Sequence, residues 1–148
     1  MSLESRIMQD LKVAMKQKDQ ASMRAIRAIK SAILLRKTDG SGTEITDEEE
    51  IKLLQKLVKS RKESLDIYQK QNREDLAKVE EEEIIVIEKY LPAAMNEQEA
   101  EQMVIDIITE TGAVGMKDMG KVMSLASSRA AGRVDGKFLA QLVRNKLS

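Results

Sequence analysis

The chain has 148 residues, of which 42% are hydrophobic and only 2% aromatic, and its formal net charge at pH 7 is zero. This length fits one domain or two small ones. A core that lacks aromatic residues must consist of Leu, Ile, Val, Ala and Met, which suits packed helices better than sheets. The absence of cysteine and histidine excludes disulfides, thiolate metal sites and histidine-based catalysis. We therefore expect no metal and no cofactor.

The charges are unevenly distributed. Residues 1–37 carry nine basic against three acidic residues, residues 38–90 nine against fifteen, and residues 91–148 seven against seven. The basic N-terminal arm could attract nucleic acid, or it could neutralise the acidic middle within a folded hairpin. The N-terminus is polar where a signal peptide would be apolar, and no later segment resembles a membrane span. We expect a cytoplasmic protein with no membrane partner.

The first 37 residues have the spacing of two helices or of one broken helix. Apolar residues recur at helical spacing over residues 3–15 and again over 23–33, and the polar residues 17–20 separate them. Residues 38–46, rich in Gly, Ser, Thr and Asp, form the clearest loop in the sequence.

The loop ends in a signal for a long helix. Thr46 and Glu49 have capping-box spacing. Asn72 is a possible N-cap for a further helix that runs to about Tyr90. Residues 84–87, Ile-Ile-Val-Ile, would suit a strand in isolation. We predict a helix there, because a single strand cannot satisfy its backbone hydrogen bonds.

The only proline, Pro92, marks the predicted module boundary, because it cannot continue a helix and biases Leu91 to an extended conformation. The predicted fold is all-α, with an N-terminal multi-helix module over residues 1–91 and a small C-terminal three-helix module over residues 92–148. The smaller module has a size at which domains fold alone only marginally. We expect it to pack on the first module or on a partner.

The three C-terminal helices have clear limits. Asn96 with Glu99 is another N-terminal capping signal, and Gly112 should end that helix. A second amphipathic helix should stop at Gly132, and Asp135 can cap the third.

The search for catalytic groups is mostly negative. The segment 112–121 contains glycines and a lysine, but it lacks the ending of a phosphate-binding loop and a preceding strand. Residues Glu80 to Glu83 suit a solvated helix face with lysine partners four residues away. Ser127 and Ser128 have no histidine to activate them. Three short motifs stand out, each with a structural interpretation: dipole compensation, close helix packing, capping or chain direction. Their residues are Pro92, Asp118, Gly120, Gly132, Asp135 and Gly136.

In combination, the motifs YLP (90–92), DMGKVM (118–123), GRVDG (132–136) and LVRNKL (142–147) resemble the GatB/YqeY family. The resemblance covers nearly the whole chain, although Gly115 stands where a capping Ser or Thr is expected. The family comprises small free-standing proteins and the tail domain of the B subunit of the glutamyl- and aspartyl-tRNA amidotransferase.

The resemblance implies an all-helical fold of two modules and a role with tRNA. In the amidotransferase the tail contacts the tRNA body, while kinase and amide-transfer chemistry lie in other domains and subunits. The family association with carbon–nitrogen ligases that use glutamine as amide donor would then be inherited from those other parts. Catalysis by this chain alone is not expected.

The leading hypothesis is a non-catalytic tRNA- or RNA-binding accessory protein with a link to tRNA-dependent amidation. Phosphates would be contacted by basic side chains and by amides at the helix starts near residues 117 and 136. The candidates in the C-terminal module are Lys117, Lys121, Arg129, Arg133, Lys137 and Arg144, and a second patch comprises Arg24, Arg27 and Lys30.

The alternative is a protein-interaction module with no RNA role. Its partner, a protein of tRNA amidation or translation, would be contacted through methionines of the C-terminal module. At helical spacing, these methionines equally suit core packing. The methionines in question are Met103, Met116, Met119 and Met123.

Overall fold

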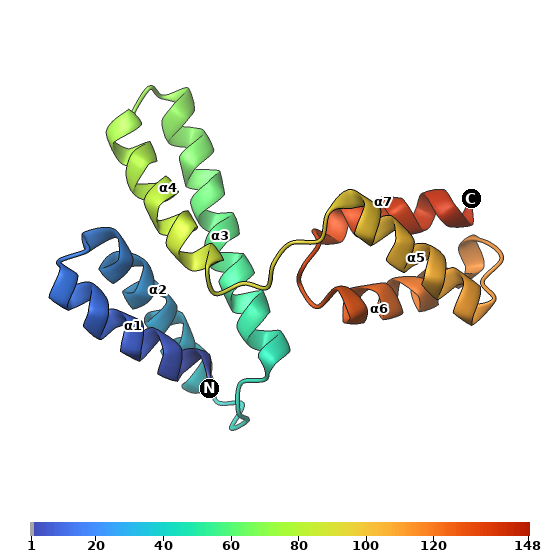
Figure 1. Ribbon diagram of the computed structural model, residues 1–148, viewed down its shortest axis with the longest axis horizontal. Helices are drawn as coiled ribbons and strands as arrows, with labels where there is room; N and C mark the ends of the chain where they lie inside the picture. The colour runs from blue at the N-terminus through green and yellow to red at the C-terminus, as the bar shows by residue number, and fades with distance from the viewer. Residues whose placement is uncertain (1) are drawn as a thin grey trace. The chain divides into compact units, whose positions relative to one another are not determined.

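The computed structural model describes residues 2–148, and those residues form seven α-helices and one short 3-10 helix without any strand (Figure 1). The prediction of an all-helical fold is confirmed. The chain divides into two compact units, Met1–Leu91 and Pro92–Ser148, called here the N-terminal and C-terminal units. Within the described residues, every helix is too short or too polar to cross a membrane.

The polar break near residue 18 separates two helices, α1 (Leu3–Gln17) and α2 (Gln20–Lys37). Lys18 ends α1 in the left-handed region, with φ 55°. Asp19 then starts α2, because its carboxylate accepts a hydrogen bond from the Ser22 amide at 3.1 Å. The sequence left open one broken helix or two, and the structure has two.

The loop after α2 leads to the long helix α3 (Asp47–Lys70), as predicted. Thr46 caps it by accepting a hydrogen bond from the Glu49 amide at 3.2 Å. The reciprocal half of the capping box is absent from the hydrogen bonds recorded among residues 2–148. The Glu49 carboxylate instead accepts a hydrogen bond from Arg36 Nε at 2.7 Å, which ties α3 to the end of α2.

The last helix of the N-terminal unit is α4 (Glu74–Glu88), and its start differs from the prediction. Asn72 is not the N-cap: it occupies the left-handed region with φ 57°, and Arg73 takes the N-cap position without a side-chain cap bond. A polar turn residue suits both positions, so the sequence located the turn but not the cap. Residues 84–87 are helical, as predicted.

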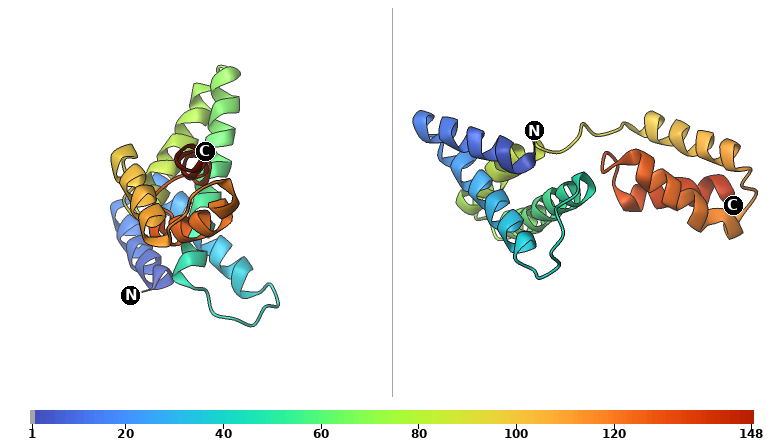
Figure 2. Two further views of the ribbon diagram at one scale, coloured as in Figure 1. Left: turned by 90° about the vertical axis from the view of Figure 1, so that its right-hand side faces the viewer. Right: turned by 90° about the horizontal axis from the view of Figure 1, so that it is seen from below.

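The core of the N-terminal unit lies between its four helices, which Figures 1 and 2 show side by side in pairs. It is aliphatic, as the composition requires. Its buried members are Leu3, Ile7, Ala25, Ile26, Ile29, Ile33, Leu54, Val58, Ile84, Val86 and Ile87.

The acidic run on α4 is only in part the solvated face that the sequence suggested: Glu81 is exposed, but Glu82 and Glu83 pair with arginines. Arg24 of α2 pairs with Glu82 at 3.0 Å, and Arg61 of α3 pairs with Glu83 at 3.5 Å. The Glu83 and Arg61 side chains are only 12% and 17% exposed. The expected lysine partners four residues away are replaced by arginines of two other helices. This network also supports the neutralisation of the acidic middle by the basic N-terminal segment.

The C-terminal unit consists of α5 (Glu97–Thr111), the 3-10 helix η1 (Met116–Asp118), α6 (Met119–Ala130) and α7 (Gly136–Leu147). Its core is again aliphatic, with methionines at the periphery. The buried residues are Val104, Ile107, Val122, Ala126, Ala130, Leu139, Val143 and Leu147.

Capping in this unit follows the prediction at α5 and departs from it later. Asn96 accepts a hydrogen bond from the Glu99 amide at 2.8 Å, and Gly112 ends α5 with φ 68°. Helix α6 ends at Ala130 with Ala131 as its C-cap, one residue before the predicted stop at Gly132, and both Ala131 and Gly132 have positive φ. Asp135 occupies the N-cap position of α7 but makes no side-chain cap bond.

Candidate nucleic-acid interface

The charges of the C-terminal unit are segregated by helix. Helix α5 carries only carboxylates among its charged residues, whereas α6 and α7 carry only cations. The carboxylates of α5 are Glu97, Glu99, Glu101, Asp106 and Glu110, and the cations of α6 and α7 are Lys121, Arg129, Lys137, Arg144 and Lys146. The net charge of the unit is therefore zero because one acidic helix and two basic helices offset each other.

Two of the predicted phosphate contacts are engaged within the unit. Arg129 donates hydrogen bonds to the two carboxylate oxygens of Glu110 from its terminal nitrogens Nη1 and Nη2. Arg133 lies 3.6 Å from Glu99 and donates a hydrogen bond to the Ala93 carbonyl at 2.8 Å. These arginines fasten α6 and the following turn to α5 and to the segment before it, so they are less available to phosphate than a sequence reading suggests.

The other four candidates of this unit are free of such partners. Lys117, Lys121, Lys137 and Arg144 are exposed, and no ion pair with them occurs within the described residues. Lys121 lies on α6, Lys137 and Arg144 lie on α7, and Lys117 lies on η1, which contacts both of these helices. This set is what remains of the predicted interface for an anionic partner.

The GRVDG motif forms the turn between α6 and α7. The backbone turns through two left-handed residues, Ala131 with φ 48° and Gly132 with φ 80°. The carbonyl of Arg133 then accepts a hydrogen bond from the Met95 amide at 2.8 Å. Together with the bond from Arg133 to Ala93, this fixes the segment that enters α5.

The DMGKVM motif has a structural role at Asp118 but not at Gly120. The Asp118 carboxylate accepts a hydrogen bond from the Val114 amide at 3.1 Å, which closes the turn before α6. The prediction that Gly120 allows close helix packing is wrong, because a Cβ there would meet no atom within 4 Å. Gly136 begins α7 with the same open surroundings.

The two helix starts provide a weaker anion site than expected. Asp118 and Asp135 stand at the N-cap positions of α6 and α7, and neither makes a side-chain cap bond. The first-turn amides are therefore uncapped by side chains, but two carboxylates oppose a phosphate at the same places. The lysine and arginine side chains, rather than the amides, are the better donors.

The second predicted patch separates into two kinds of residue. Arg24 is held by Glu82 and lies 4.0 Å from Glu83. Arg27 and Lys30 are exposed and have no ion pair within the described residues. Of the predicted patch, Arg24 is thus engaged within the N-terminal unit, whereas Arg27 and Lys30 remain without an ion pair among the described residues.

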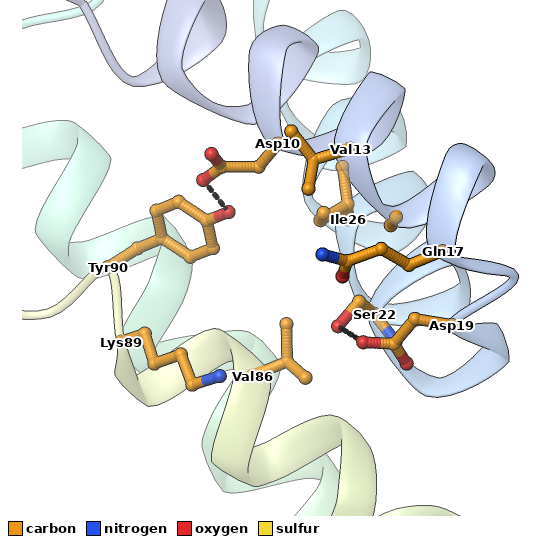
Figure 3. A pocket seen from close by; sticks show the side chains of 10 residues that line it. Asp10, Val13, Gln17, Asp19, Ser22, Ile26, Val86, Lys89 and Tyr90 are labelled. Carbon is orange, nitrogen blue, oxygen red and sulfur yellow. Dashed lines mark hydrogen bonds between the residues drawn. The ribbon is translucent and has the colours of Figure 1, made fainter.

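A hollow of about 220 Å³ lies between the α1–α2 pair and the end of α4 (Figure 3). Its lining combines an apolar floor with a polar rim from all three helices. The Tyr90 hydroxyl donates a hydrogen bond to Asp10, and Arg6 stands 5.3 Å from the centre of the tyrosine ring. Sequence reasoning missed this hollow because its residues lie far apart in the chain.

Two titratable groups of the hollow, Tyr90 and Asp19, have pKa values shifted away from neutral pH. Burial, and then the hydrogen bond to Asp10, raise the pKa of Tyr90, so its hydroxyl keeps the proton. Hydrogen bonds from Ser22 lower the pKa of Asp19, so that carboxyl stays ionised. Neither group is tuned for proton transfer at neutral pH. Among residues 2–148 no cluster of three or more potential metal ligands occurs either.

Fold and charge define a small all-helical protein whose C-terminal unit has segregated charge. Residues 4–147 match the model of the family described as "Yqey-like protein". The chain is 35% identical over 116 residues to "Altered inheritance of mitochondria protein 41, mitochondrial" of Vanderwaltozyma polyspora, covering 74% of this chain and 63% of that protein. The protein of the same name from Pyrenophora tritici-repentis is 30% identical over 148 residues, covering 94% and 77%.

The chain belongs to the YqeY-like family, since the match covers nearly all of it. A third relative of the same name, from Clavispora lusitaniae, is 38% identical over 105 residues, with 69% of this chain and 61% of that protein covered. The chain thus spans less than two thirds of the Vanderwaltozyma and Clavispora relatives. The predicted cytoplasmic location is wrong, because these relatives are named as mitochondrial proteins.

Proposed function

We propose that this chain is a non-catalytic accessory protein that binds folded tRNA through the cations of α6, α7 and the turn before α6. The observation that carries the proposal is a set of four exposed cations without ion pairs among the described residues. These cations lie outside the acidic helix α5, and they are Lys117, Lys121, Lys137 and Arg144. Basic side chains of this kind contact phosphates and position a protein on nucleic acid without reading its sequence.

The aromatic residues favour phosphate contacts over base contacts. Tyr68, Tyr90 and Phe138 are the only aromatic side chains in the sequence, and each is partly buried. Recognition of single-stranded bases depends on stacking against exposed aromatic rings. A folded RNA, which presents phosphates in a fixed arrangement, is therefore the better match for this surface.

Family membership supports the same partner. The resemblance to the amidotransferase tail, which contacts the tRNA body, implies a tRNA grip separated from the chemistry of amide transfer. A link to tRNA-dependent amidation would then place this chain as a helper of enzymes that carry the catalytic domains.

The alternative is a protein-interaction module built on methionines of the C-terminal unit. Most of these methionines are not exposed enough to contact a partner. Met103, Met119 and Met123 pack against the core of that unit. Met116 alone of the four candidates is strongly exposed, at 46%. One methionine does not make a docking patch of the size that specific interfaces need.

Binding of a labelled tRNA to the full chain, followed by fluorescence anisotropy at low salt, tests the proposal. The double variant Lys121→Gln, Arg144→Gln should weaken binding and flatten its salt dependence by about two, one for each lost contact. Lys56→Gln, Lys59→Gln, two exposed lysines on α3 without ion pairs within the described residues, serves as the charge-matched control. Equal loss in both variants would show non-specific attraction and contradict the assignment.

A further inference from the structure

The outer side of the α1–α2 pair combines exposed apolar side chains with cations. Met8, Lys12 and Met15 are spaced i, i+4, i+7 on α1, and Arg27, Lys30 and Leu34 are spaced i, i+3, i+7 on α2, so each set forms one stripe. Met8, Met15 and Leu34 are 38%, 54% and 60% exposed. The three cations have no ion pair within the described residues. We call these six residues the outer face.

One interaction shows that both stripes lie on the same side of the α1–α2 pair, and a second shows which side that is. Glu4, one turn before Met8, pairs with Lys37, which lies two turns beyond Lys30. This pair joins the two stripes at one end. On the opposite side of α1, Asp10 accepts the hydrogen bond from Tyr90 at the end of α4. The outer face therefore points away from α4.

The carboxylates of this helix pair do not neutralise the outer face. The pair has only three of them: Glu4 is engaged by Lys37, Asp10 by Tyr90, and Asp19 by Ser22. The surface thus carries uncompensated positive charge between apolar side chains. A partner that satisfies both features must be acidic and apolar at once.

We propose that the outer face docks an acidic amphipathic helix of a protein partner, laid across the two stripes of α1 and α2. Such a helix places its apolar stripe on Met8, Met15 and Leu34 and its flanking carboxylates on the cations. Methionine side chains are unbranched and adapt to the partner's shape. A nucleic acid would leave the apolar residues unused. A lipid surface favours a wide apolar face of Trp, Phe and Leu, whereas this face has no aromatic residue and a single leucine.

The test uses the full chain and a fluorescein-labelled synthetic helix of about the length of α2, with leucines at i, i+4, i+7 and i+11 and glutamates on both flanks. Fluorescence anisotropy should show binding with a Kd on the order of micromolar. Two probe controls should not bind: a peptide of the same composition with leucines distributed around the helix, and one with lysines in place of glutamates.

Variants separate this face from the rest of the unit. Met15→Gln, Leu34→Gln should weaken binding about tenfold or more, through lost apolar contact. Lys12→Gln, Lys30→Gln should weaken it and reduce its salt dependence. Ile67→Gln, Ile85→Gln, which changes exposed isoleucines of α3 and α4, should leave it unchanged. Circular dichroism should confirm that all variants retain the wild-type helix content.

Three results would overturn the proposal. One is no binding of the acidic amphipathic probe to the wild-type chain at millimolar concentration. Another is equal binding of the distributed-leucine peptide. The third is binding of anionic phospholipid vesicles or tRNA that depends on Met15 and Leu34 while the peptide does not bind, which would assign the face to a lipid or a nucleic acid instead.

Discussion

Two glycines of the C-terminal unit differ in their need for a missing side chain. Gly120 lies in α6 with no atom near its Cβ position, while Gly112 ends α5 with φ 68°. Gly120→Ala should therefore stabilise the protein by about 0.4–1 kcal/mol, because alanine restricts the unfolded chain. Gly112→Ala should destabilise it by about 1 kcal/mol or more, since alanine resists the left-handed region. Urea unfolding of both variants measures the two changes in the free energy of unfolding. A destabilised Gly120→Ala would restore the close-packing role that the structure denies.

Glu110 illustrates an exposed ion pair whose strength depends on pH. The hydrogen bond from Arg129, helped by its charge, lowers the pKa of Glu110 below 4.5. A carboxyl with a lowered folded-state pKa contributes stability above its unfolded pKa, and this contribution is lost as the pH falls through the folded pKa. We expect Arg129→Gln to return the Glu110 pKa toward 4.5, as measured from carboxyl chemical shifts by NMR. An unchanged pKa would mean that the pair does not persist in solution.

At the level of whole helices, the cap of α5 contributes measurably to the C-terminal unit. The Asn96 side chain accepts a hydrogen bond from the backbone amide of Glu99. Its Nδ2 also donates a hydrogen bond to the Glu99 carboxylate at 3.0 Å. Asn96→Ala should cost about 1 kcal/mol, the usual loss of an N-cap. Gln98→Ala, an exposed change in the same first turn, should have almost no effect. Thermal unfolding followed at 222 nm compares them, and equal effects would argue against the cap.

The elements that sequence reasoning located well depend on local signals. The caps at Thr46 and Asn96 and the end of α5 at Gly112 each rest on residues within one turn, so the sequence suffices. The misplaced cap at Asn72 and the end of α6 at Ala131 are shifts of one residue, within the range over which several turn residues compete.

The partners of charged residues were not predictable in the same way. Arg24 with Glu82, Arg129 with Glu110 and Arg133 with Glu99 join different elements of the fold. Composition gives the number of cations, but only tertiary packing decides which of them remain free. The structure therefore reduces the candidate interface from nine predicted residues to those that pair with no carboxylate. The hollow beside Tyr90 could not be predicted, because residues distant in the sequence form it.

At the scale of the whole molecule, Arg133 holds the segment with which the C-terminal unit begins, before α5. Met95 and Ala93 are both hydrogen bonded to this residue. Arg133→Gln should loosen residues 92–96 and speed cleavage there by a protease of broad specificity, while cleavage in the exposed loop 38–46 stays unchanged. Mass spectrometry of the fragments reads out both sites. Early cleavage inside α6 in the wild-type protein would contradict the compact C-terminal unit.

The salt dependence of tRNA binding tests the central proposal most directly. If Lys117, Lys121, Lys137 and Arg144 each neutralise one phosphate, the logarithm of the association constant should fall with the logarithm of salt concentration at a slope of about −3 to −4. Changing all four to glutamine should bring that slope close to zero, with helix content unchanged. Wild-type protein that fails to bind tRNA at about 50 mM salt, or a four-residue variant that retains the wild-type slope, would contradict the proposal.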